Sequence, residues 1–189
     1  MRLDPEGFAF TSFLERHFET IREEERALAR AEYAPWPQRE AYSGEWLVFP
    51  LVARGVDLGV PGLDLEANRR RCPRTAEVLL SVDRLVLAGF SRLEPGSHIF
   101  PHVDGSSPDV VRCQLPLHVP SGSLFRIAEW AGPSTEGRCL VFRGVTEHES
   151  VNRGTAPRTV LLADFRFPSL GRGEARRSTE RTSSSTSGP

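Results

Sequence analysis

Residues 136–168 read EGRCLVFRGVTEHESVNRGTAPRTVLLADFRFP, and this stretch decides the fold. Its short apolar runs are separated by turn residues, at Gly144, Gly154 and Pro157. Apolar runs of about 4 to 8 residues bounded by Gly and Pro are typical of β-strands, whereas helices need longer periodic segments. The stretch therefore predicts several short strands that belong to an antiparallel sheet.

The same pattern extends upstream to about residue 84. Turn signals such as Pro95-Gly96 and Gly132-Pro133 recur at intervals of about 8 to 12 residues. Many short strands at this spacing predict an antiparallel sandwich or barrel. The predicted strands are Arg84–Leu93, Val110–Val119, Ser123–Ala128, Arg138–Phe142, Glu149–Asn152 and Arg158–Phe165.

The N-terminal part has a different pattern. Residues 5 to about 32 predict an amphipathic helix, because apolar residues recur near helical spacing with Glu and Arg between them. Further on, Glu45–Val52 predicts a buried strand, and Thr75–Val82 predicts a short helix that follows Pro73. We expect this helical material to cover one outer face of the sheet. The apolar residues of the first helix are Phe10, Phe13, Leu14, Phe18, Ile21 and Leu28.

The chain has 189 residues, which suffices for one domain with a sizeable core. We expect a single domain over residues 1–168, in which 1–39 form a helical support and 40–168 form the β core. Residues 169–189 are rich in Ser, Thr, Gly and Arg and contain almost no apolar side chains. Such a segment buries too little surface to offset its ordering entropy, so the sequence predicts a disordered tail.

Composition narrows the class of protein. Hydrophobic residues make up 39% and charged residues 26%, and the formal net charge is −1, so we expect neither nucleic acid nor a membrane as partner. The chain shows no signal peptide and no apolar run that could cross a bilayer. Three well-separated cysteines predict no disulfide framework and no structural zinc site. These features favour a cytoplasmic protein, and they leave its oligomeric state open.

A possible metal site begins at His102-Val103-Asp104. Residues i and i+2 of an extended segment point to the same face, so His102 and Asp104 could bind one metal ion together. A second His from a neighbouring strand, for which His148 is the candidate, would complete a two-His-one-carboxylate set suited to Fe(II). A turn hydrogen bond between His102 and Asp104 is the alternative, because Asp next to Gly often serves turns.

Arg158 opens the apolar strand RTVLLADF (158–165). A guanidinium directed into a barrel is unfavourable unless it meets an anion. Its planar fork suits bidentate binding of a carboxylate, and a small dicarboxylate co-substrate would be such an anion. The residues alone leave two other interpretations open, a salt bridge to Asp164 and an exposed position at the rim.

Several segments carry a family pattern. PGSHIFPHVDG (95–105), VVRCQLPLHVP (110–120) and residues 136–168 contain, in order, PGxxIxPH, an Arg-containing strand ending in Pro, EGxxLVF, HExxN, and an Arg before an apolar strand closing in FP. Together with EAYSGEWLVFPL (40–51) and CPRTAEVL (72–79), they resemble the aspartyl/asparaginyl β-hydroxylase family of 2-oxoglutarate-dependent oxygenases. The resemblance implies a mainly β fold, a cupin-like jelly roll or double-stranded β-helix with N-terminal helices on one face.

The resemblance also implies residue roles. His102 and His148 match the family's two iron-binding histidines. Arg158 matches the Arg that holds the distal carboxylate of 2-oxoglutarate. Arg112 matches a strand Arg that approaches the co-substrate from the other side, and Ser91 aligns with a Ser near the same pocket.

Two positions depart from the family pattern. Gln114 stands where the family has a His after the strand Arg, and we count it among the co-substrate residues. Asp104 stands where the family has Gly, so this chain is similar to the free-proline hydroxylases, which keep HxD and a later His. His98 would share a side with His102 in a regular strand, but the family needs no ligand there, and we expect it at the rim or in a loop.

The expected function follows from these roles. The chain is expected to use Fe(II), 2-oxoglutarate and O2 to hydroxylate an amino acid or an amino-acid residue in a peptide. A metal-dependent cupin-type enzyme that does not use 2-oxoglutarate is one alternative, because it needs the metal ligands but not Arg158. A non-catalytic jelly-roll binding domain is another.

Overall fold

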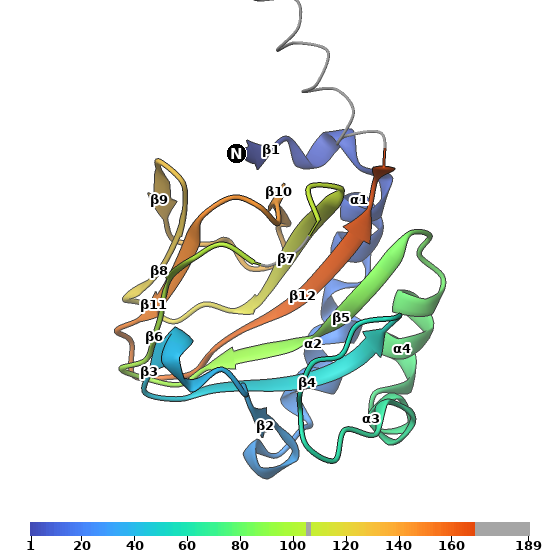
Figure 1. Cartoon of the computed structure of the whole chain (residues 1–189). Helices are drawn as coiled ribbons and strands as arrows, with labels where there is room; N and C mark the ends of the chain where they lie inside the picture. The colour runs from blue at the N-terminus through green and yellow to red at the C-terminus, as the bar shows by residue number, and fades with distance from the viewer. Residues whose placement is uncertain (105–106, 169–189) are drawn as a thin grey trace, which may run out of the picture.

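Two antiparallel sheets form the body of the protein (Figure 1). This computed structural model describes residues 1–104 and 107–168, so the predicted tail lies outside the described residues. The elements, with 3-10 helices written η, are β1 (Arg2–Leu3), η1 (Pro5–Gly7), α1 (Ala9–Arg16), α2 (Phe18–Arg26), η2 (Arg30–Glu32), β2 (Ala34–Pro35), η3 (Arg39–Ala41), β3 (Tyr42–Ser43), β4 (Trp46–Ala53), α3 (Leu65–Arg71), α4 (Pro73–Leu80), β5 (Leu85–Leu93), β6 (His98–His102), β7 (Val110–His118), β8 (Ser123–Ile127), β9 (Trp130–Gly132), β10 (Leu140–Arg143), β11 (His148–Asn152) and β12 (Arg158–Arg166).

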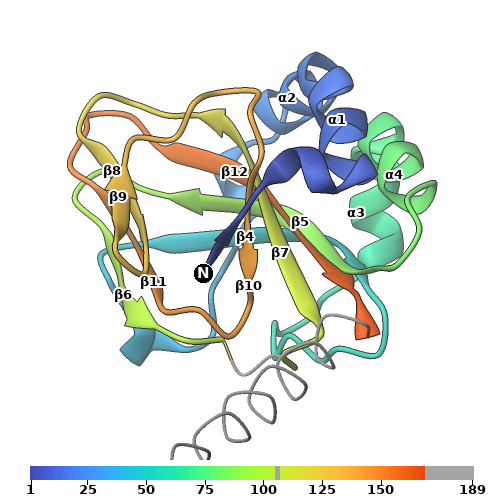
Figure 2. The ribbon, with the colours of Figure 1, turned by 90° about the horizontal axis from the view of Figure 1, so that it is seen from above.

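Within the described residues, the larger sheet has seven strands in the order β1-β10-β7-β12-β5-β4-β2. The smaller sheet has five, in the order β3-β6-β11-β8-β9. All paired strands run antiparallel, and chain neighbours often lie in different sheets, as in a jelly roll. The helices cover the face of the larger sheet that points away from the smaller one (Figure 2). The predicted mainly β architecture with helices on one face is confirmed.

The central strand β12 shows how the sequence directs side chains to the two faces of the larger sheet. Leu161, Ala163 and Phe165 belong to the core between this sheet and the helices. The alternate positions, including Arg158 and Asp164, point toward the smaller sheet because successive side chains of a strand face opposite ways. The same alternation on β5 and β7 turns further polar side chains inward. These are Ser91, Arg112 and Gln114.

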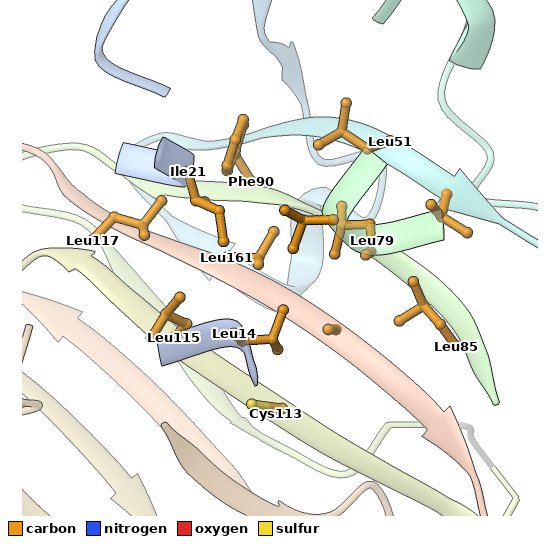
Figure 3. Close-up of a cluster of buried hydrophobic side chains, with 14 of the residues drawn as sticks. Leu14, Ile21, Leu51, Leu79, Leu85, Phe90, Cys113, Leu115, Leu117 and Leu161 are labelled. Carbon is orange, nitrogen blue, oxygen red and sulfur yellow. The ribbon is translucent and has the colours of Figure 1, made fainter. Parts of the chain in front are cut away.

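The core between the helices and the larger sheet is apolar and fully enclosed (Figure 3). Leu14 of α1 and Ile21 of α2 have no exposed surface and pack over β7 and β12. Phe10 stacks on Phe165 with ring centroids 3.8 Å apart. Most of the free energy that holds the helices to the sheet therefore comes from apolar burial, at about 25 cal/mol per Å².

The N-terminal helical segment differs from the expectation of one helix over residues 5 to 32. It forms two helices, α1 and α2, which break at His17, whose φ of −97° and ψ of 9° leave the helical region. The break lets each helix place its own apolar stripe on the twisted sheet, a tertiary requirement that outweighs local propensity. The short strands β1 and β2 flank this segment on either side.

Helix α3 was not expected from the sequence. Asp64 caps it by accepting hydrogen bonds from the N–H groups of Glu66 and Ala67, which stabilises the first turn. The predicted short helix after Pro73 is present as α4, two residues earlier than expected at its start and its end. Over the described part of the chain, no helix is long and apolar enough to cross a membrane.

The enclosed core predicts a strong response to truncation of a helix residue. Leu14→Ala should lower the free energy of unfolding by between about 2 and 5 kcal/mol, because it removes buried methyl groups and leaves a cavity. Ser12→Ala, on the exposed side of the same helix, should change it by less than about 0.5 kcal/mol. Urea unfolding followed by circular dichroism measures both. Equal effects of the two substitutions would contradict the proposed packing.

Candidate active site

A bulge in the smaller sheet places the first predicted metal ligand. Strand β6 pairs with β11 so that Ile99 faces Ser150 and His102 faces His148. Between these two pairs the chain advances by three residues on β6 and by two on β11, which is the register change of a β-bulge. Because of this extra residue, His102 turns toward the same interior face as Ile99.

The bulge also explains why a regular-strand argument fails for His98. Its side chain lies on the outer face of the smaller sheet, where Nε2 is 2.9 Å from Glu149 Oε2. Glu149 is held in turn by Arg126 of β8. His98 thus belongs to a surface ion-pair network within strand β6, and it lies neither in a loop nor beside His102.

The three predicted ligands lie together between the sheets. One ligand atom from each of His102, Asp104 and His148 lies within 4.8 Å of the others. Nε2 of His102 is 3.7 Å from Asp104 Oδ1, and Nε2 of His148 is 3.7 Å from Asp104 Oδ2. The strand end at His102, the following residues and the start of β11 supply these groups. This arrangement has the spacing that one metal ion needs.

Backbone carbonyl groups orient both imidazoles. Nδ1 of His102 lies 2.7 Å from the oxygen of Phe100, and Nδ1 of His148 lies 2.9 Å from the oxygen of Thr146. A carbonyl oxygen can only accept, so each Nδ1 carries the proton and donates it. In the neutral ring this donation selects the tautomer whose Nε2 keeps its lone pair, and both Nε2 atoms face Asp104. Outer hydrogen bonds of this kind fix the tautomer of metal-binding histidines.

Burial lowers the pKa of His148 to about 4, outweighing the opposing attraction of Asp104. Its imidazole is therefore neutral at pH 7, as a metal ligand must be. Two imidazoles and one carboxylate form the donor set that non-heme Fe(II) oxygenases use. The residues present thus fit an Fe(II) ion.

Arg112 lies beside this cluster between two carboxylates. Its Nε and Nη2 donate to the two oxygens of Asp164 at 2.8 and 2.7 Å, and Nη1 forms an ion pair with Asp104. Burial disfavours the charge, but both carboxylates hold the pKa of Arg112 above its ordinary value. Asp164 is therefore the partner of Arg112, and the possible salt bridge between Asp164 and Arg158 is wrong.

Arg158 has the opposite surroundings. It is 3% exposed, and its Nη2 donates to Gln114 Oε1 at 3.2 Å and to Ser134 Oγ at 3.5 Å. Among the described residues no carboxylate forms a salt bridge with it, and burial alone lowers its pKa to about 10. A buried guanidinium without an anion is unfavourable, so this position calls for an anionic ligand.

One pocket contains both Arg158 and the two candidate histidine ligands. Its volume is about 350 Å³, part of it open to solvent, and His102, His148 and Arg158 all line it. Ser91, Arg112 and Gln114 line the same pocket, so all four predicted co-substrate residues meet there. The Ser91 hydroxyl accepts a hydrogen bond from Trp46 Nε1 at 2.9 Å. The co-substrate roles of these residues stay predictions, but the structure gathers them around one cavity.

Sequence reasoning assigned no role to Ser134, Trp46 or Asn152. Asn152 is fully buried and donates from Nδ2 to the carbonyl oxygens of Leu93 and Ala156, both at 2.9 Å. It thereby closes the turn that leads from β11 to Arg158. The HExxN pattern (148–152) contains this residue, so its signal was present. Ser134 lies in a loop without periodicity, where the sequence offers no signal.

The chain is similar to proteins of known family. It is 33% identical over 175 residues to "Aspartate beta-hydroxylase domain-containing protein 2" of Rattus norvegicus, covering 85% of this chain and 49% of that protein. It is 30% identical over 176 residues to "Ornithine lipid ester-linked acyl 2-hydroxylase" of Rhizobium tropici, covering 87% and 60%. The chain thus spans about half the length of the mammalian relative.

The fold is shared with a solved structure of a 2OG-Fe(II) oxygenase family oxidoreductase from Burkholderia pseudomallei. The TM-score is 0.50 at 16% identity, covering 80% of this chain and 79% of that one. The family model described as Aspartyl/Asparaginyl beta-hydroxylase matches residues 15–168, which include every predicted site residue. By this match, and with its fold and its His-Asp-His cluster, the chain belongs to the aspartyl/asparaginyl β-hydroxylase family.

Proposed function

We propose that this chain is an Fe(II)- and 2-oxoglutarate-dependent dioxygenase that hydroxylates an amino acid, free or within a peptide. One observation carries the proposal. Arg158 is a buried guanidinium without a carboxylate partner in the described structure, and it lines the same pocket as His102 and His148. A dicarboxylate in this pocket could place one carboxylate at the metal-ligand residues and pair the other with Arg158.

Each residue then has a defined task. His102, Asp104 and His148 would hold Fe(II), which supplies the chemistry with O2 when bound. Arg158 would bind the distal carboxylate of 2-oxoglutarate through its planar fork. Gln114 and Ser134 keep that guanidinium oriented, because each accepts a hydrogen bond from Nη2. The carbonyl oxygens of Phe100 and Thr146 orient the two imidazoles so that both Nε2 atoms face Asp104.

Two alternative functions make different demands on the site. A cupin-type metal enzyme without 2-oxoglutarate needs the three ligands but gives Arg158 no task. A non-catalytic binding domain needs neither the three ligand residues nor Arg158, although buried ionisable groups are unfavourable to retain for packing alone. The names of the relatives range from aspartyl and asparaginyl β-hydroxylation to ester-linked acyl 2-hydroxylation, so the pocket walls must decide the substrate class.

The metal assignment predicts a selective loss of Fe(II) binding. His148→Ala should weaken binding by more than the roughly 10- to 100-fold that loss of an outer hydrogen-bond partner causes, because it removes a ligand. His98→Ala is the matched control, since it removes a histidine from the outer face of the same sheet. Titration calorimetry with Fe(II) under argon measures both. Equal affinities of the two variants would refute the assignment of His148.

The co-substrate assignment predicts that Arg158→Met weakens 2-oxoglutarate binding by about 30-fold or more, the equivalent of roughly 2 kcal/mol for a buried charge pair. The readout is the visible charge-transfer band that forms when Fe(II) and 2-oxoglutarate are added without oxygen. Arg153→Met, at an exposed position in the next turn, should leave the affinity unchanged.

A second ligand shows whether Arg158→Met removes only the pairing with the distal carboxylate or disrupts the whole pocket. 2-Oxopentanoate has the same 2-oxo acid end but lacks the distal carboxylate, so its weaker binding should not change with Arg158→Met. A band that is absent from folded wild-type protein would overturn the proposed function. Turnover without 2-oxoglutarate that tolerates Arg158→Met would favour the cupin-type alternative.

A further inference from the structure

A second pocket adjoins the candidate active site. Its volume is about 520 Å³, part of it open to solvent, and it shares Trp46, Ser91, Arg112 and Leu162 with the pocket that contains Arg158. Asp104 lines only the second of these two pockets, whereas His102 and His148 line only the first. The metal cluster therefore lies where the two pockets meet. A ligand on the second side would lie next to the metal without occupying the space around Arg158.

Apolar side chains form the walls of this second pocket. Val48 and Pro50 come from β4, Leu87 from β5 and Leu162 from β12, while Leu58 lies in the loop before α3. Leu58, Leu87 and Leu162 are each only partly buried, although they line an interior space. Partly exposed apolar surface inside a pocket gains free energy when an apolar ligand covers it.

The charges beside this pocket leave no cation for an acidic substrate. Arg112 is the only basic residue among the described residues that line it, and Asp164 and Asp104 already occupy its guanidinium. A substrate carboxylate there would meet the charge of Asp104 without a partner of its own. The leucine walls offer a carboxamide no hydrogen-bond partner, because the described polar lining is confined to Ser91, Asp104 and Arg112 beside the metal-ligand residues, and unpaired polar groups disfavour binding.

We propose that this pocket is the substrate site and that it takes an uncharged, saturated aliphatic chain, rather than the carboxylate or carboxamide side chain that the family is named for. The inference rests on the Fe(II) and 2-oxoglutarate chemistry of the proposed function, which puts the oxidising metal at the edge of the pocket; an acyl chain would take the place of the amino acid proposed there as substrate. The balanced reaction converts a C–H bond, O2 and 2-oxoglutarate into a C–OH group, succinate and CO2. One atom of O2 enters the hydroxyl group and the other enters succinate.

The second pocket opens into a neighbouring cleft, so a ligand longer than the pocket could extend into that cleft. This third, wider cleft of about 1210 Å³, part of it open to solvent, shares Trp36, Leu58 and Leu87 with the second pocket. Its lining adds apolar residues such as Val56 and also charged ones, among them Asp57 and Arg166. A chain that enters from this cleft along Leu58 and Leu87 would reach Asp104. Two sources offer this chemistry, an acyl chain and an aliphatic amino-acid side chain, and chain length distinguishes them.

The test measures binding to the metal-free full-length protein through tryptophan fluorescence, since Trp36 and Trp46 line the pocket and stack at 4.8 Å. Probes are N-methylalkanamides of six, eight and ten carbons, N-acetylleucinamide, and the corresponding amides of aspartate and asparagine. The alkanamide affinity should rise about fourfold with each added methylene. N-acetylleucinamide that binds as well as the ten-carbon amide would identify a side chain as the source; weaker binding would identify an acyl chain.

Matched variants locate the binding. Leu58→Gln and Leu87→Gln should each weaken alkanamide binding about tenfold, because they place a polar group on the apolar wall. Leu124→Gln, at an exposed leucine of β8, should have no effect, and circular dichroism verifies that all three fold. Addition of Fe(II), 2-oxoglutarate and O2 should then yield an alkanamide with one added oxygen atom by mass spectrometry.

Several outcomes would overturn the inference: affinities that do not depend on chain length, tighter binding of the aspartate or asparagine amide, or no binding at all. These results are separate from those that test the proposed function, because the fluorescence titration uses neither iron nor 2-oxoglutarate. A charge-transfer band without alkanamide binding refutes only the aliphatic substrate. Alkanamide binding without the band refutes the oxygenase function.

Discussion

The bidentate ion pair between Arg112 and Asp164 lies in the space between the two sheets, and the candidate site is arranged around it. It joins neighbouring strands β7 and β12, where Arg112 and Asp164 are register partners. The guanidinium also reaches Asp104, which connects the larger sheet to the end of β6. Removing one member of such a buried pair leaves an uncompensated charge, which is strongly unfavourable. The pair therefore limits how far Asp104 can move from the two histidines.

The two buried arginines of this interior have different surroundings and hence different capacities. Arg112 pairs with two carboxylates, while within residues 1–104 and 107–168 the polar and ring contacts of Arg158 are an amide oxygen, a hydroxyl group and the ring of Phe125 at 5.4 Å. A guanidinium that already pairs with carboxylates holds those side chains in place, whereas a guanidinium without a carboxylate partner can bind an anionic ligand. This difference separates a side of the metal cluster suited to a dicarboxylate from a side suited to apolar groups.

Much of this arrangement could be predicted from the sequence, because it follows from local rules. The two-residue alternation of strands correctly directs Arg158 and Arg112 inward, and turn residues mark most strands within two positions. The break at His17 and the bulge before His102 could not be predicted, since both depend on how distant segments pack. The same holds for the partner of Asp164, which only the register of β7 and β12 decides. The apolar walls of the second pocket come from four separate segments, so no single sequence motif predicts the pocket.

The bulge between β6 and β11 makes the candidate metal centre depend on how the two strands pair as well as on residue types. Ile99 and His102 are three residues apart and still face the same way, so regular pairing at this chain length would turn the imidazole of His102 to the outer face beside His98. A deletion of one residue between Ile99 and His102 would remove the bulge and leave the histidine two residues after Ile99, where regular pairing directs it inward again. Among relatives, a chain one residue shorter at this point would therefore still be compatible with an intact centre.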